Sequence, residues 1–247
     1  MVNYGLDLSG VDLDAALVDL VAEGDRLEAV VAGERDWSPG TPAVGWTVAH
    51  QIAHLAKADT NVLIALKDPA SFANVGTDAD GDAAVGAAQP REVLLEQWRT
   101  GRVELSEALG ELPADRAFPW FGSELNAQLM ISLRLMETWA HGQDIYDTLG
   151  IEHEPTRGLE HVAALGVAGR EMSFAVAQLA VPAEPFRVEL TGPGGGSWGP
   201  EDAEQRIEGS ALDFCLRVTH RRDRAQTDLK AVGEDADSWL DVARVFL

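Results

Sequence analysis

Ionisable side chains that could bind a metal ion together are concentrated in two segments of the 247-residue sequence. In one segment, Glu137, His141 and Asp144 continue the helix face that begins with the apolar Leu133. Burying such groups without partners is costly, so they must pair, face water or bind a ligand. Glu137 and His141 are four residues apart and could meet one ion, with Asp144 orienting the histidine. The alternative is a Glu–His pair on a solvated helix face.

The second segment contains His50 and His54, which are also four residues apart. Helical spacing puts His54 well away from the apolar stripe of its own helix, so periodicity alone does not place it in the core. Two histidines and one glutamate from two helices of a bundle would make a three-ligand metal site with an open coordination position. The sequence contains neither an HExxH motif nor paired cysteines, so it does not indicate a zincin or a zinc finger.

The hydrophobic pattern predicts a helical first part and a mixed last part. Apolar residues recur at spacings of three and four, the period of one helix face. The Gly-, Ala- and Asp-rich segment 70–89 has little periodicity, and we expect it to be a long loop able to cover a site. After Pro182 the pattern alternates, as in a strand. The predicted helices cover 11–33, 47–68, 91–110, 123–149 and 158–180; they are followed by a strand at 186–190, a turn at 192–200, a short strand and a helix within 206–220, a strand at 229–233 and a final helix at 235–247.

These elements predict a four-helix bundle over residues 1–181, followed by a small α/β domain over residues 182–247. A chain of this length can bury a core without disulfides or structural metals. Cys215 is the single cysteine, which excludes an intrachain disulfide framework and makes a reducing cytoplasm the expected setting. Because Cys215 lies in the apolar stretch ALDFCL, we expect it in the core.

The net charge of −22 limits the classes of partner. A chain this acidic, without an extended basic patch, is not expected to bind nucleic acid, whose phosphates need clustered Lys and Arg. The same sign disfavours an anionic membrane surface. We see no apolar stretch long enough to span a membrane and no signal peptide. A small-molecule partner is the remaining expectation.

Two sequence segments carry a resemblance to a known family. GWTVAHQIAHL and RLMETWAHGQDIYDTLG resemble the metal-binding bundle of the mycothiol-dependent maleylpyruvate isomerase family, part of the DinB-like superfamily. The tail beginning FRVELTGPGGGSW is similar to the small, sterol-carrier-like α/β domain that follows the bundle in that family. The resemblance covers nearly the whole chain and is closest to an actinobacterial subgroup of unassigned substrate. It implies that His54, Glu137 and His141 hold a divalent ion, which is zinc in the isomerase.

The resemblance leaves three further residues with open roles. His50 departs from the family pattern, in which an acidic residue is more common, and could be a fourth ligand, a group that orients a ligand or a helix cap. Arg221 falls where an arginine of the isomerase approaches the site. Because Arg222 follows it directly, either of the two could correspond to that arginine. Arginine suits the bidentate binding of a substrate carboxylate.

The resemblance implies a zinc-dependent isomerase or S-transferase that uses mycothiol, or a similar thiol, on an electrophilic and anionic small molecule. A bound cation lowers the pKa of a thiol and holds it as thiolate. With Cys215 expected in the core, that thiol must come from a cofactor. Two alternatives stay open: a non-catalytic module that binds a metal or a ligand, and a metal-dependent hydrolase whose open position holds water.

Overall fold

The computed structural model describes residues 8, 12–113 and 115–245, and it divides the chain into two compact units. The first unit is built on residues 12–153 and the second on residues 154–245. The boundary expected at residue 182 falls inside the second unit, because the helices before it pack there against helices that follow it. Helices and strands together make the mixed fold class that the sequence predicted.

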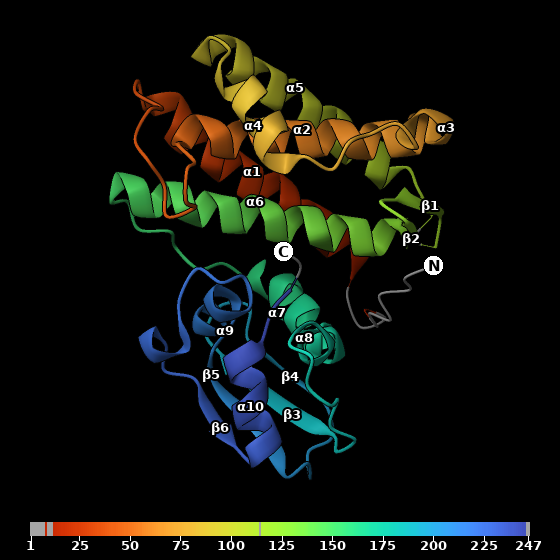
Figure 1. Cartoon of the computed structure of the whole chain (residues 1–247), viewed down its shortest axis with the longest axis vertical. Coiled ribbons are helices and arrows are strands. Elements are labelled where there is room, and N and C mark those ends of the chain that lie inside the picture. Colours follow the sequence, from red (N-terminus) through yellow and green to blue (C-terminus); the bar gives the residue numbers. More distant parts are fainter. Residues whose placement is uncertain (1–7, 9–11, 114, 246–247) are drawn as a thin grey trace. The chain divides into compact units, whose positions relative to one another are not determined.

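The first unit is mainly helical, and its long helices α1, α2, α5 and α6 pack against one another (Figure 1). The side chains of Asp12 and Asn126 accept backbone N–H groups at the starts of α1 and α6. Helix α6 ends at Leu149 and is capped by Gly150, whose φ of 65° is costly for other residues. The elements of this unit are α1 (Leu13–Gly33), α2 (Val48–Lys67), α3 (Pro69–Phe72), α4 (Ala79–Ala87), α5 (Arg91–Gly110), β1 (Ala117–Trp120), β2 (Ser123–Asn126) and α6 (Ala127–Leu149).

Segment 70–89 is not the long loop that its composition predicted, because it contains most of α3 and all of α4. Each of these short helices has its own N-cap: Asp68 accepts the N–H of Ser71, and Asp78 accepts the N–H of Gly81 at 2.9 Å. Helix α4 then packs on α2. Caps and packing therefore stabilise a helix that has almost no apolar periodicity of its own.

The predicted start of the longest helix at residue 123 is also wrong. Residues 123–126 form β2, which pairs antiparallel with β1 in a hairpin. The helix begins at Ala127, and its N-cap is Asn126 rather than Ser123. The hydroxyl of Ser123 instead donates a hydrogen bond to the carbonyl oxygen of Trp120 within the hairpin. A side chain that suits an N-cap also suits a turn, and here the turn is formed.

The core of the first unit lies between the apolar faces of its long helices. Leu27 of α1, Ile52 of α2, Trp98 of α5 and Ile145 of α6 are buried in one cluster. Removing one such side chain from water contributes about 1.5–3 kcal/mol. This packing holds α2 alongside α6, which is the arrangement that the predicted metal site requires.

The second unit is a four-stranded sheet, in the order β4-β3-β5-β6, with helices packed against it. Strands β3 and β5 are parallel, and the other neighbours are antiparallel. Trp239 packs edge-on against Phe186 and Phe214 in its core. Cys215 is fully buried, as predicted. The elements are α7 (Leu159–Ala168), α8 (Arg170–Val176), β3 (Phe186–Thr191), β4 (Gly196–Trp198), β5 (Gln205–Ser210), α9 (Ala211–Val218), the 3-10 helix η1 (Arg224–Gln226), β6 (Lys230–Val232) and α10 (Glu234–Val242).

Three details of the second unit differ from the predictions. The helix expected over 158–180 divides at Gly169 into α7 and α8. The turn expected at 192–200 contains the short strand β4, which pairs with β3. The last helix ends at Val242, and residues 246–247 of its predicted range lie outside the described residues. Among the described residues, no helix has the length and apolar character needed to cross a membrane.

Candidate metal centre

His54, Glu137 and His141 meet between α2 and α6. The Oε2 atom of Glu137 lies 3.2 Å from the Nε2 atom of His54 and 3.2 Å from the Nε2 atom of His141. One ligand atom from each of the three side chains lies within 4.8 Å of the others. Glu137 and His141 are on adjacent turns of α6, and His54 faces them from α2. The side chains that the sequence singled out are thus close together.

The geometry of this cluster, His54, Glu137 and His141, fits a small divalent ion. Ligand atoms about 2.0–2.1 Å from a tetrahedral zinc ion are about 3.3–3.4 Å apart, close to the 3.2 Å that separates Glu137 Oε2 from each histidine nitrogen. The side chains of His54, Glu137 and His141 are 21%, 28% and 15% exposed. Because they are only partly buried, a ligand from solution can approach the position that such an ion would take. The donor set is the three-ligand type that leaves one coordination position open.

The charge state of Glu137 also suits a ligand role. Burial alone disfavours the charged carboxylate, but hydrogen bonds and positive charge from His141 and His54 outweigh that effect. The pKa of Glu137 is therefore held well below its usual value. The carboxylate is ionised at neutral pH and needs to lose no proton before it binds a cation.

Gln51 orients His141, a role that its position in the sequence did not indicate. This side chain is fully buried on α2, one turn before His54. Its Oε1 atom lies 2.6 Å from the Nδ1 atom of His141. Its Nε2 atom donates to Thr41 Oγ1 at 2.8 Å and to Asp144 Oδ2 at 3.3 Å. A hydrogen bond from Nδ1–H to Gln51 leaves the lone pair of Nε2 for an ion.

Asp144, which was predicted to orient His141, reaches it mainly through Gln51. The Oδ2 atom of Asp144 is 3.9 Å from the Nδ1 atom of His141, longer than a hydrogen bond. The amide of Gln51 bridges the two, since it donates to Asp144 and accepts from His141. The signal available in the sequence was a glutamine three positions before the candidate ligand His54.

His50 lies at the start of α2, where its ring forms a cap. The backbone N–H of Thr47 donates to the Nδ1 atom of His50 at 3.3 Å, and the Thr47 hydroxyl oxygen lies 2.8 Å from the same atom. Among the three roles that the sequence left open, this geometry corresponds to the capping role.

Trp46 forms an aromatic wall beside the two histidines, and it too was missed. Its ring is stacked on that of His141, with centroids 5.8 Å apart and an interplanar angle of 18°. Its centroid lies 5.2 Å from that of His54. The indole N–H donates to Asp80 Oδ1 at 2.7 Å. Asp80 is in the first turn of α4. Helix α4, which belongs to segment 70–89, therefore lies beside Trp46.

The two candidate arginines lie in the second unit, just after α9. The Nη1 atom of Arg221 donates to the carbonyl oxygen of Thr219 at 2.7 Å, and that of Arg222 donates to the carbonyl oxygen of Arg221 at 2.8 Å. These contacts orient both guanidinium groups. A role for either in binding a substrate stays a prediction.

Comparison with known proteins shows the family to which this chain belongs. The model of the mycothiol maleylpyruvate isomerase N-terminal domain matches residues 19–146, about half of the chain, and this match includes all three candidate ligands. The chain belongs to this family. A second family model, described as wyosine base formation, matches residues 182–231 of the second unit.

Solved structures and sequence relatives agree with membership of the isomerase family. A crystal structure of the mycothiol-dependent maleylpyruvate isomerase has a TM-score of 0.63 at 17% identity, covering 94% of this chain and 95% of that chain. A histidine-to-alanine mutant of that isomerase has a TM-score of 0.62 at the same identity and coverage. Uncharacterized proteins of two Mycobacterium tuberculosis strains, CDC 1551 and H37Rv, are 47% identical over 244 residues, covering 93% of this chain and 94% of theirs.

Proposed function

We propose that this chain is a zinc-dependent enzyme of the cytoplasm that uses a low-molecular-weight thiol, mycothiol, in isomerisation or S-transfer on an electrophilic, anionic small molecule. The observation that carries the proposal is the convergence of His54 from α2 with Glu137 and His141 from α6, at separations that suit one tetrahedral ion. Membership of the isomerase family supports the use of a thiol.

The protein's own residues would perform distinct tasks in this reaction. His54, Glu137 and His141 would hold the ion, and Gln51 would keep the ring of His141 turned so that Nε2 faces it. A divalent ion there would lower the pKa of a bound thiol, so that the thiolate is present near neutral pH. Trp46 covers one side of the two imidazole rings and limits the access of water.

The nucleophilic sulfur must come from outside the chain. Cys215 is fully buried in the second unit, its thiol donates to the carbonyl oxygen of Leu159 at 3.5 Å, and burial raises its pKa far above the usual value. A thiol held in the neutral form is a poor nucleophile. Addition of an external thiolate to an electrophilic carbon gives isomerisation if the thiol leaves again, and S-transfer if it stays.

Arg221 and Arg222 are proposed to bind the carboxylate of the substrate or of the thiol. The net charge of −22 repels anions over most of the surface, so local positive charge is needed where an anionic substrate binds. Replacing each arginine with lysine in turn keeps the charge but loses the bidentate geometry, and we expect KM to rise more than kcat falls.

Metal analysis of the purified protein tests the proposal most directly. We expect about one zinc ion per chain in the wild type, and loss of that ion in His54→Ala and Glu137→Ala. His50→Ala is the matched control, because its ring caps α2, and it should keep the metal. Stoichiometric metal in both ligand variants would rule the centre out.

A panel of electrophiles with and without mycothiol then separates the reaction classes. Isomerisation without net consumption of the thiol supports the proposed chemistry, and so does consumption of the thiol with formation of an S-conjugated product. Turnover of an ester or amide without thiol would instead indicate a hydrolase. Tight ligand binding without any turnover would indicate a binding module.

A further inference from the structure

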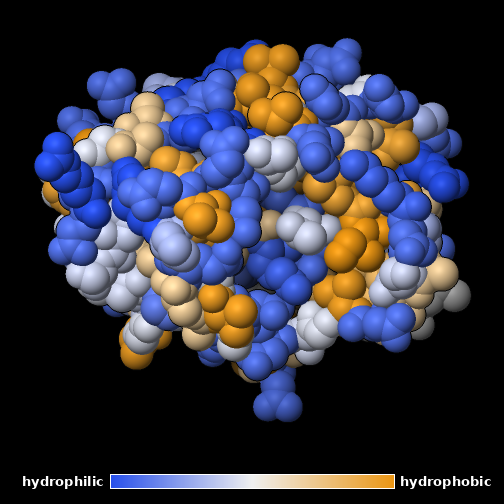
Figure 2. All heavy atoms as spheres, turned by 90° about the horizontal axis from the view of Figure 1, so that it is seen from above, coloured by the Kyte–Doolittle hydropathy of each residue, from blue (hydrophilic) through white to orange (hydrophobic). Residues whose placement is uncertain are grey.

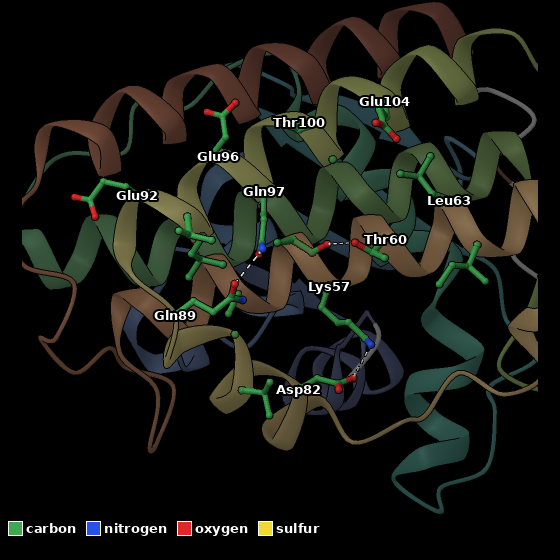
Figure 3. A pocket seen from close by; sticks show the side chains of 18 of the residues that line it. Lys57, Thr60, Leu63, Asp82, Gln89, Glu92, Glu96, Gln97, Thr100 and Glu104 are labelled. Atoms are coloured by element: carbon green, nitrogen blue, oxygen red, sulfur yellow. Dashed lines mark hydrogen bonds and ion pairs between the residues drawn. The ribbon is translucent and has the colours of Figure 1, made fainter.

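A long groove lies between α2, α4 and α5 of the first unit, on residues that the metal centre does not use (Figure 3). Its volume is about 1050 Å³. Small-molecule sites usually measure about 300–1,000 Å³. Along α5 the lining runs from Glu92 to Glu104, about 18 Å at the helical rise of 1.5 Å per residue. The groove is therefore long enough to hold an extended molecule of small-ligand size.

The surface of the groove is mainly aliphatic. Leu63 and Ile64 of α2 and Leu94 of α5 line it. Val85 of α4 and Val93 of α5 also line it while remaining 73% and 44% exposed. Seen from above, the molecule shows separate hydrophobic patches beside a hollow in a largely hydrophilic face (Figure 2). Apolar walls of this kind favour a ligand with an apolar body.

Two glycines in the groove differ in what a side chain would meet. A Cβ atom on Gly86 would lie 2.6 Å from the Cβ atom of Ala53, so the close packing of α4 on α2 requires glycine there. A Cβ atom on Gly101, within α5, would meet nothing within 4 Å. Glycine inside a helix costs about 0.5–1 kcal/mol relative to alanine. Packing does not require glycine at Gly101, so a side chain placed there would enter the open space of the groove.

The charges that line the groove are predominantly negative. Lys57 lies 3.6 Å from Asp82, and Lys67 lies 3.5 Å from Glu104, so each lysine already has a carboxylate partner (Figure 3 shows the first pair). The charged lining residues are Lys57, Lys67, Asp68, Asp82, Glu92, Glu96 and Glu104. Five carboxylates thus face two lysines, and the excess is negative.

Two of the carboxylates that line the groove, Glu92 and Glu96, lie one turn apart on α5. Like charges at this spacing destabilise a helix. Each of them has an ion pair with an arginine, Glu92 with Arg91 at 3.4 Å and Glu96 with Arg99 at 2.8 Å, but Arg99 also binds Glu28 of α1. A cation bound beside Glu92 and Glu96 would reduce their mutual repulsion.

We propose that this groove binds a hydrophobic cation, an elongated apolar molecule whose amine or quaternary ammonium head lies near Glu92 and Glu96. The charge of the lining decides between the occupants that an apolar groove could take. A fatty acid would bring a carboxylate to a negative surface, and a second copy of the chain in a symmetric dimer would bring the same negative surface to itself. Of these three occupants, the positively charged ligand is the one that matches both the apolar walls and the carboxylates of the lining.

Titration calorimetry of the full-length protein with two ligands of equal chain length tests the charge preference. We expect decyltrimethylammonium, below its micelle concentration, to bind saturably at one site per chain. Decanoate should bind at least about tenfold more weakly, because its head is repelled. Added salt should weaken the binding of the cation. Equal binding of the two probes, or none of the cation, would contradict the proposal.

Substitutions in the groove test the location of the site. Gly101→Leu would fill the open space and should abolish binding of decyltrimethylammonium without lowering Tm. Gly33→Leu is the matched control, because a Cβ atom at Gly33 at the end of α1 also meets nothing within 4 Å. The double variant Glu92→Gln with Glu96→Gln should weaken the binding of decyltrimethylammonium and should not weaken the binding of decanoate. Unchanged binding in Gly101→Leu, or a dimer that only Gly101→Leu dissociates, would overturn the proposal.

The proposal for the groove and the proposal for the metal centre can be tested independently. His54→Ala should lose the metal and keep full affinity for decyltrimethylammonium, because His54 does not line the groove. Loss of this affinity in His54→Ala, in a variant that still folds, would contradict a separate site.

Discussion

The Oε1 atom of Gln51 on α2 lies 2.6 Å from the Nδ1 atom of His141 on α6, so a fully buried amide fixes the ring of a candidate metal ligand. The same amide donates to Asp144, which is itself buried. Partners of this kind set the tautomer and orientation of a ligating imidazole. We therefore expect the affinity of this candidate centre for a metal to depend on a residue that would not touch the ion.

Gln51→Leu should lower the affinity for zinc by about 10–100-fold, the usual effect of removing a group that orients a ligand. Competition with a chromogenic chelator measures this affinity. Gln51→Glu keeps an acceptor oxygen for His141 and should lose less. Gln97→Leu, on the exposed side of α5, serves as the control and should leave affinity unchanged. Equal affinity in Gln51→Leu and the wild type would show that His141 needs no such partner.

The pairing of Glu137 with His141 was predictable from short-range spacing within a helix, whereas the inclusion of His54 depended on the resemblance to a known family, because helical spacing put it away from the apolar stripe of α2. Residues four apart lie on one face, and neighbouring antiparallel helices of a bundle bring such faces together. The contributions of Gln51 and Trp46 depend on the distance and rotation between α2, α6 and the segment before α2. These quantities are set by packing of the whole unit, which no local pattern encodes.

Helix α4 is a second feature that local sequence patterns did not predict. Its sequence, ADGDAAVGA, has no apolar stripe, so periodicity predicted a loop. The helix forms because Asp78 caps it and because Gly86 allows it to approach α2 closely. By contrast, the start of α2 at Thr47 and its end at Asp68 were predicted correctly from capping residues and a following proline.

A buried hydrogen bond between Glu23 of α1 and His153 links two distant parts of the first unit's sequence. The Nε2 atom of His153 lies 2.8 Å from Glu23 Oε1, and both side chains are 2% exposed. The Nδ1 atom of His153 lies 3.1 Å from Gln143 Oε1, and the ring stacks on Tyr146 at 4.1 Å between centroids. Burial opposes the charge of Glu23, but His153 and Arg26 outweigh it and lower its pKa.

Glu23→Gln should destabilise the protein by about 1–3 kcal/mol near neutral pH, because the buried ring of His153 and the guanidinium of Arg26 lose their carboxylate hydrogen-bond acceptor. The folded-state pKa of Glu23 lies below its usual value of 4.5, so its contribution is complete above pH 4.5 and is lost as pH falls through the folded-state value. The difference from wild type in urea unfolding should therefore shrink in acid. The exposed Glu107→Gln is the control, and a pH-independent difference would contradict this account.

Asp59 of α2 and Arg134 of α6 form a second buried pair, with Oδ1 3.0 Å from the Nε atom and 2.9 Å from the Nη2 atom of the arginine. Asp59→Asn should cost about 3–5 kcal/mol because the charge of Arg134 is then uncompensated. The double variant Asp59→Leu with Arg134→Met should be more stable than that single variant, since it removes both buried charges. Urea unfolding measures both. A double variant less stable than Asp59→Asn would show that the pair is needed for packing.

Trp46 should report metal binding directly, because its ring lies within 6 Å, between centroids, of the rings of His54 and His141. Cobalt(II) binds the same kinds of ligand as zinc and quenches nearby indole fluorescence. Titration with cobalt should reduce the emission of the wild-type protein in proportion to occupancy. Trp46→Phe should lose most of this quenching and still bind cobalt, as judged by the visible absorption of the ion.

The control for this prediction is Trp98→Phe, since Trp98 is buried in the core of the first unit between α2 and α5. Its replacement should lower total emission and leave the fraction quenched by cobalt nearly intact or raised. Asp80→Asn weakens the acceptor of the indole N–H and should shift the emission of Trp46 without removing the response to the metal. If cobalt binds and Trp46→Phe is quenched as fully as the wild type, the ion is bound away from His54 and His141.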